Sequence, residues 1–176
     1  NVVPTFTPVA AICSGATLTA LPTTSNNGIT GTWAPALSNT TTTTYTFTPA
    51  AGQCATTTTL TITVNPNVVP TFNPVAAICS GATAPVLPTT STNGITGTWS
   101  PAIVSNTATA TYTFTPTAGQ CATTTTLTVT VNPNVVPTFT PVAAICSGAT
   151  LTALPTTSTN GITGTWAPAL SNTTTT

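Results

Sequence analysis

Cysteines are the side chains of this 176-residue sequence with the clearest capacity for covalent chemistry, and there are five of them. Cys13 and Cys54 are 41 residues apart, and Cys79 and Cys121 are 42 residues apart. Paired thiols form disulfides that persist in oxidising, extracellular surroundings. The predicted bonds are Cys13–Cys54 and Cys79–Cys121, with free buried thiols or bridges between repeats as the alternatives. This use of cysteine predicts an extracellular location.

Cys146 is the fifth cysteine and occupies the same sequence context as Cys13 and Cys79. By the spacing of the other pairs, we expect its partner about eleven residues beyond Thr176. A disulfide that closes a loop of about 40 residues stabilises a fold by about 4 kcal/mol if its effect is entropic. Such a bond would decide whether one small module folds.

Trp33, Trp99 and Trp166 occur at equivalent positions and could form one sugar-stacking platform per module. The competing interpretation, which we favour, places each indole in a core beside the disulfide. Threonine runs such as Thr40–Thr44 could carry glycans or face polysaccharide or ice. They are better explained as outward strand faces, because threonine is polar and still suits a strand.

The sequence has no Lys, Arg, Asp, Glu or His. General acid–base catalysis requires groups that exchange protons near neutral pH, so we expect no enzyme. Metal sites depend on carboxylates, imidazoles or clustered thiolates, so neither a metal nor another cofactor is expected. Nucleic acid is excluded as a partner by the absence of cations. Apolar runs are too short for membrane insertion of this segment.

The motif Asn-Val-Val-Pro-Thr-Phe begins at Asn1, Asn67 and Asn134 and defines a tandem repeat. The predicted domains are repeat 1 (residues 1–66), repeat 2 (67–133) and repeat 3 (134–176). Repeat 3 is incomplete, and we expect it either to continue beyond Thr176 or to be completed by another chain. Ile103 and Val104 stand where repeat 1 has Leu37 alone, and such an insertion indicates a surface loop.

Two segments of repeat 1 alternate polar and apolar residues with the period of a β-strand, residues 44–48 and 59–64. Pro49 and Gly52 lie between them, which predicts an antiparallel hairpin. The Asn27-Gly28 turn signal precedes a short strand around Trp33. The predicted core consists of Val2, Val3, Phe6, Val9, Ile12, Leu18, Leu21, Ile29, Trp33, Leu37, Tyr45, Phe47, Leu60, Ile62 and Val64.

The order Cys13, Trp33, Tyr45, Cys54 is similar to that of an immunoglobulin-like sandwich, in which a Trp packs near an inter-sheet disulfide. The fold class we predict is all-β: tandem small immunoglobulin-like β-sandwich modules of antiparallel strands, with one disulfide per module. We expect about six or seven strands in each module.

Three blocks, residues 12–17, 28–33 and 44–49 with Gly52-Gln53-Cys54, carry a resemblance to a known family. The chain resembles the immunoglobulin-like or PKD-like tandem repeats of large surface proteins from gliding Bacteroidota. The resemblance covers all three repeats. It implies a bacterial cell-surface location, export through the type IX pathway and a role as an adhesin or surface fibre.

These observations predict a structural or adhesive extracellular protein that forms a fibre, stalk or filament. The alternative is a multivalent carbohydrate-binding array in which Trp or Thr surfaces contact polysaccharide. Because the net charge is zero, little repulsion keeps copies apart. We therefore expect the chain's main partner to be itself, through neighbouring repeats or lateral association.

Overall fold

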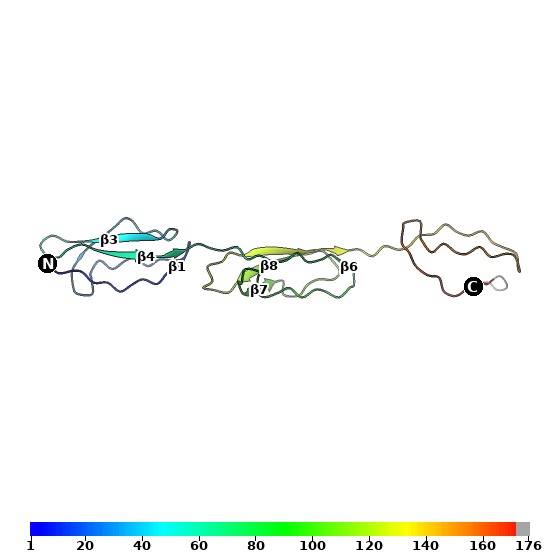
Figure 1. Ribbon diagram of the computed structural model, residues 1–176, viewed down its shortest axis with the longest axis horizontal. Coiled ribbons are helices and arrows are strands. Elements are labelled where there is room, and N and C mark those ends of the chain that lie inside the picture. Colours follow the sequence, from blue (N-terminus) through cyan, green and yellow to red (C-terminus); the bar gives the residue numbers. More distant parts are fainter. Residues whose placement is uncertain (172–176) are drawn as a thin grey trace. The chain divides into compact units, whose positions relative to one another are not determined.

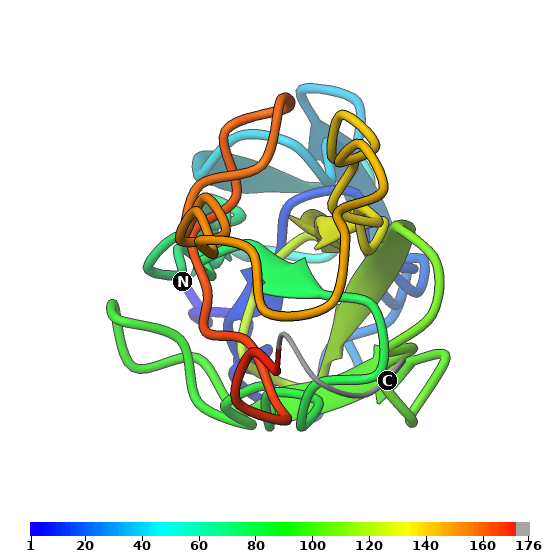
Figure 2. The same cartoon turned by 90° about the vertical axis from the view of Figure 1, so that its right-hand side faces the viewer.

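The computed structural model describes residues 1–171, and strands are the regular elements found there (Figure 1). Repeat 1 contains β1 (Ile12–Cys13), β2 (Gly31–Ala34), β3 (Thr43–Pro49), β4 (Thr58–Ile62) and β5 (Val64–Asn65). Repeat 2 contains β6 (Ile78–Cys79), β7 (Gly97–Ser100), β8 (Ala110–Pro116), β9 (Thr125–Val129) and β10 (Val131–Asn132). Neither Figure 1 nor the end-on Figure 2 shows a helix in the described part. Within residues 1–171, no helix has the length and hydrophobicity to cross a membrane.

The predicted hairpin of repeat 1 is confirmed by the antiparallel pairing of β3 with β4, in which Tyr45 lies opposite Leu60. Strand β2 contains Trp33 and adds to the other edge of β3, with Trp33 opposite Phe47. The resulting sheet has the order β2-β3-β4. Repeat 2 forms the same sheet from β7, β8 and β9. The all-β class and the antiparallel sheets are therefore as the sequence predicts.

A parallel pair of short strands accompanies each antiparallel sheet. In repeat 1, β1 pairs with β5, so that Ile12 lies opposite Val64 and Cys13 opposite Asn65. Strands β6 and β10 pair in the same way in repeat 2. Each of these repeats therefore has five strands instead of the expected six or seven, because the weakly alternating residues 17–21 run as irregular chain.

The core of repeat 1 lies under the β2-β3-β4 sheet. Tyr45 and Ile62 are fully buried and pack with Leu21. Phe6, Trp33 and Phe47 form a ring cluster, with centroids of each pair between 4.7 and 5.1 Å apart. Three predicted core residues are exposed instead, namely Val2, Val3 and Leu37. These residues lie outside the segments that alternate polar and apolar residues, Val2 and Val3 in the N-terminal segment and Leu37 in the loop after β2.

Repeat 2 reproduces this core with Tyr112, Phe114 and Trp99. Its inserted residue lies in the loop between β7 and β8, where Ile103 is 85 % exposed. The surface position of the insertion is therefore confirmed. Val104 follows in the same loop and packs against the core.

Contacts divide the chain into two compact units, Asn1–Asn132 and Pro133–Thr176. The first unit contains repeats 1 and 2 up to Asn132. In the described part of the second unit, Phe139 and Trp166 pack with ring centroids 4.6 Å apart, and Thr157 bridges to Thr163. These contacts match those of Phe6 with Trp33 and of Thr24 with Thr30 in repeat 1.

Replacing Tyr45 with Phe should lower the free energy of unfolding by about 1 to 3 kcal/mol, because a partly buried backbone donor loses its acceptor. The Tyr45 hydroxyl accepts a hydrogen bond from the Ser38 amide at 2.9 Å, and the phenol is fully buried. Urea denaturation measures the change. The control is Thr48→Val, also on an exposed position of β3, which should alter the unfolding free energy by less than about 0.5 kcal/mol.

Stability should depend little on pH, because the chain has no acidic, basic or imidazole side chain whose protonation is linked to folding. We expect the melting temperature to vary by less than about ten degrees between about pH 3 and pH 8. Scanning calorimetry of protein with alkylated free thiols tests this. A larger variation would mean that a charge-linked interaction contributes to the fold.

Candidate functional site

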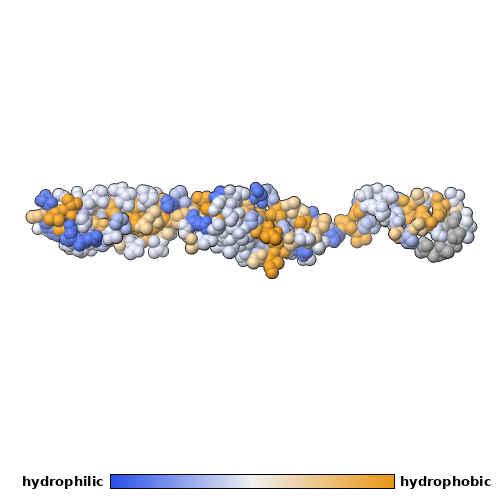
Figure 3. Space-filling view, turned by 60° about the horizontal axis from the view of Figure 1, so that its bottom comes forward, coloured by the Kyte–Doolittle hydropathy of each residue, from blue (hydrophilic) through white to orange (hydrophobic). Residues whose placement is uncertain are grey.

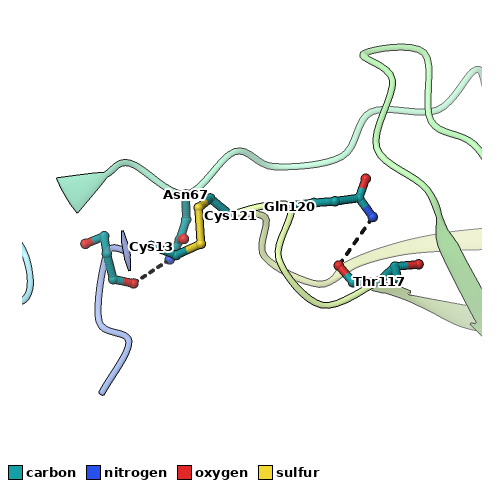
Figure 4. The surroundings of a disulfide bond; sticks show 6 residues. Cys13, Asn67, Thr117, Gln120 and Cys121 are labelled. Atoms are coloured by element: carbon teal, nitrogen blue, oxygen red, sulfur yellow. Dashed lines mark hydrogen bonds between the residues drawn. A yellow bond between two sulfur atoms is a disulfide. The ribbon is translucent and has the colours of Figure 1, made fainter. Parts of the chain in front are cut away.

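Cys13 and Cys121 form a disulfide that joins repeat 1 to repeat 2, with Cα atoms 4.9 Å apart (Figure 4). Cys54, Cys79 and Cys146 are free and exposed in the structure. The predicted pairings Cys13–Cys54 and Cys79–Cys121 are therefore wrong for this structure. The bridge between repeats, which the sequence left open as an alternative, is the one observed.

The two cysteines of one repeat do not bond to each other because they lie at opposite ends of its strands. Cys13 lies in β1 beside Asn65, the last residue of β5, and the Ser14 amide donates to the Asn65 carbonyl at 2.9 Å. Cys54 lies near the start of β4, where its carbonyl accepts from the Val2 amide at 3.0 Å.

Strands β4 and β5 run from Thr58 to Asn65 and span about 25 Å at the usual rise per strand residue. Disulfides require Cα atoms within about 7 Å of each other. The Cys13 end of repeat 1 adjoins the first residues of repeat 2, and Cys121 lies there because its carbonyl accepts from the Val68 amide at 2.8 Å.

Asn67 adds a hydrogen bond between repeats beside this disulfide (Figure 4). Its side-chain amide donates to the Ser14 carbonyl at 2.9 Å, which connects the first residue of repeat 2 to the residue after Cys13. The junction is therefore made of a disulfide, the backbone through Pro66 and this hydrogen bond. The recurrence of Asn at positions 1, 67 and 134 was the sequence signal that could have pointed to this hydrogen bond.

The glutamines that precede Cys54 and Cys121 hold the loops in which these two cysteines lie. Gln120 accepts from the Thr96 amide and donates to the Thr96 carbonyl, both at 2.8 Å. Gln53 makes the equivalent pair of bonds with Thr30. Cys54 and Cys121 both have φ of +46°, a left-handed conformation that is uncommon outside glycine. The recurring Gly-Gln-Cys triplet was the sequence signal that could have predicted this hydrogen-bonded loop.

The asparagine before each predicted turn glycine has a wider role than local geometry. Gly28 has φ of +83°, as the turn requires. The Asn27 side chain accepts from the Thr5 amide at 3.2 Å and donates to the Val3 carbonyl at 2.9 Å. It therefore fastens the N-terminal segment of the repeat to the turn, and Asn93 and Asn160 make the same contacts in repeats 2 and 3.

The three tryptophans occupy equivalent places but differ in exposure. Trp33 is half-buried in its ring cluster, Trp99 is 9 % exposed and Trp166 is 45 % exposed. Each indole N–H donates to a proline carbonyl, at 2.8 to 2.9 Å. In repeats 1 and 2 the indole also contacts a Phe from the central strand, Phe47 or Phe114. The positions of Trp33 and Trp99 against Phe rings fit the core interpretation better than a flat sugar platform, whereas Trp166 is largely exposed.

An open apolar groove of about 520 Å³ lies on repeat 2 beside Trp99. Val86 and Ile103 line it and are 93 % and 85 % exposed. Figure 3 shows apolar side chains gathered on the surface of this repeat. Repeat 1 has Ala20 at the position of Val86 and lacks the inserted residue, so two of the apolar side chains that line this groove have no equivalent of their size there.

Threonines line the outward faces of the sheets. The hydroxyls of Thr44 on β3 and Thr61 on β4 lie 2.8 Å apart, and Thr111 and Thr128 form the same pair at 3.0 Å in repeat 2. These cross-strand pairs agree with the interpretation of the threonine runs as strand faces. Within residues 1–171, no group of three or more metal-ligating side chains comes together.

Comparison with known proteins gives no relationship from which a function could be transferred. No family model matches the chain, and no curated protein matches it.

Proposed function

We propose that this chain is part of an extracellular structural fibre or stalk, built from small immunoglobulin-like sandwich modules in tandem and exposed at a bacterial cell surface. The Cys13–Cys121 disulfide is the observation that carries the proposal. When the chain is pulled from its ends, a bond between consecutive repeats carries the force directly from Cys13 to Cys121. The folded residues between these two cysteines are then not stretched. Its presence also supports an oxidising location.

Two further observations support a structural role. The chain has no charged side chain, so it offers no group for acid–base chemistry or for recognition of charged ligands. Trp33 and Trp99 pack in ring clusters, which leaves little indole surface for stacking on a sugar. The carbohydrate-binding array is therefore the less supported alternative.

Electron microscopy of the purified native material tests this proposal. We expect ordered filaments with an axial repeat of about 30 to 45 Å per module, an estimate from the size of small domains. Dispersed flexible strings, together with saturable binding to polysaccharide, would instead favour the carbohydrate-binding array.

Lateral association of copies should depend on the apolar groove of repeat 2. Val86→Thr combined with Ile103→Thr should weaken self-association at least about tenfold, because each buried aliphatic side chain contributes about 1.5 to 3 kcal/mol. Sedimentation velocity over a concentration series measures the change. Val69→Thr is the control, since Val69 is 56 % exposed and lies outside the groove. Equal association of all three proteins would exclude the groove as the contact.

A further inference from the structure

Cys54 and Cys79 are exposed thiols whose backbone surroundings reproduce those of the bonded cysteines. Cys79 corresponds to Cys13: it ends β6 and lies opposite Asn132, as Cys13 ends β1 and lies opposite Asn65. The following amides make the same bond, from Ser80 to the Asn132 carbonyl at 2.8 Å and from Ser14 to the Asn65 carbonyl at 2.9 Å. Cys79 is therefore positioned at the far end of repeat 2 in the same way.

Cys54 corresponds to Cys121. The Cys54 carbonyl accepts from the Val2 amide at 3.0 Å, and the Cys121 carbonyl accepts from the Val68 amide at 2.8 Å. Both cysteines share a φ of +46° and follow a glutamine that is hydrogen-bonded to a threonine backbone. Cys54 thus presents its thiol at the start of repeat 1, in the conformation that Cys121 uses to form the disulfide.

We propose that Cys54 and Cys79 are half-sites of the same head-to-tail cross-link and that their partners are cysteines of adjoining modules of this type. Cys54 bonds to the Cys13-type cysteine of a module that precedes it. Cys79 bonds to the Cys121-type cysteine of a module that follows it. Every junction of such an array then has its own disulfide, and no bond closes within a module.

Each cross-link forms by oxidation of two thiols to one disulfide, with loss of two protons and two electrons. A small-molecule disulfide such as oxidised glutathione is the oxidant, and it is reduced to two thiols in the exchange. This inference does not depend on whether the array assembles into a fibre, because it concerns the connectivity within a single chain.

The test is the full chain with a second copy of residues 1–66 inserted after Pro133, refolded with reduced and oxidised glutathione. The insert places a Cys54-type cysteine in the module that follows Cys79. Digestion with pepsin and mass spectrometry without reduction then identify the linked peptides, since the chain lacks the Lys and Arg that trypsin requires. The peptides around Cys54 and Cys121 differ in sequence, so the two possible partners of Cys79 are distinguishable.

We expect Cys79 to be linked to the Cys54-type cysteine of the inserted module. Cys13 of the first module should remain linked to Cys121. The number of free thiols should stay at the three of the unextended chain, because the new bond uses Cys79 and one added cysteine while the other added cysteine stays free. Cys54→Ser in the first module is the matched control and should leave the new linkage unchanged. Linkage of Cys79 to Cys121, or a Cys79 that stays reduced, would overturn the proposal.

Discussion

Replacing Cys13 with Ser should lower the free energy of unfolding of residues 1–132 by about 3 to 5 kcal/mol, the loss expected when a large closed loop is opened. The Cys13–Cys121 bond spans 108 residues, so it restricts the unfolded chain strongly. Calorimetry or urea denaturation measures the change, and Cys121→Ser should have the same effect.

Cys54→Ser is the control for this experiment, because Cys54 is free and exposed. It should alter the unfolding free energy by less than about 0.5 kcal/mol. A Cys54→Ser variant as unstable as Cys13→Ser would show that the bond closes within repeat 1.

Replacing Gly31 with Ala should destabilise repeat 1 by about 3 kcal/mol or more, because the new methyl group meets atoms that cannot move aside. A Cβ at Gly31 would lie 2.3 Å from the Thr48 carbonyl oxygen and 2.6 Å from the Phe47 ring. Both groups belong to β3, which pairs with β2 at this point. The substitution would therefore separate β2 from the sheet and disturb the ring cluster.

Gly164→Ala is a matched control in the same chain, because Gly164 is the equivalent residue of repeat 3 and its Cβ would meet nothing within 4 Å. Its unfolding free energy should stay within about 0.5 kcal/mol of the parent. Urea denaturation followed by tryptophan fluorescence compares the two variants. Equal effects would show that the contact with β3 does not account for the loss at Gly31.

The parts of the fold that sequence predicted are those determined by neighbouring residues. Alternation around Tyr45 and Leu60 predicted the β3–β4 hairpin, whose strands are joined by residues 50–57. The parallel pairing of Ile12 with Val64 was not predicted, because it joins segments about 50 residues apart that are too short for alternation to be visible.

The disulfide was mispredicted for a related reason. Sequence spacing shows that Cys13 and Cys54 recur in pairs, but it does not show that Cys54 precedes β4 while Cys13 pairs with the end of β5, at the opposite end of the module. The partner of Cys13 depends on the end of the module at which it lies. The pairing of β1 with β5 places Cys13 at the end that adjoins repeat 2. The Asn67 contact with Ser14 escaped notice because a single asparagine has many possible roles.

The groove of repeat 2 also depends on long-range packing. The insertion of one residue near Ile103 was predicted to mark a surface loop, and it does. That Val86 would lie on the same groove follows from the course of the irregular chain before β7, which carries no periodic signal.

Single-molecule pulling of the chain from its two ends, without reductant, tests the central claim that a disulfide connects the repeats. With Cys13 bonded to Cys121, 108 residues are bypassed, and adding reductant should lengthen the fully extended chain in one step of about 370 Å. Bonds within repeats would bypass 41 and 42 residues. Two separate steps of about 145 Å each would therefore contradict the account.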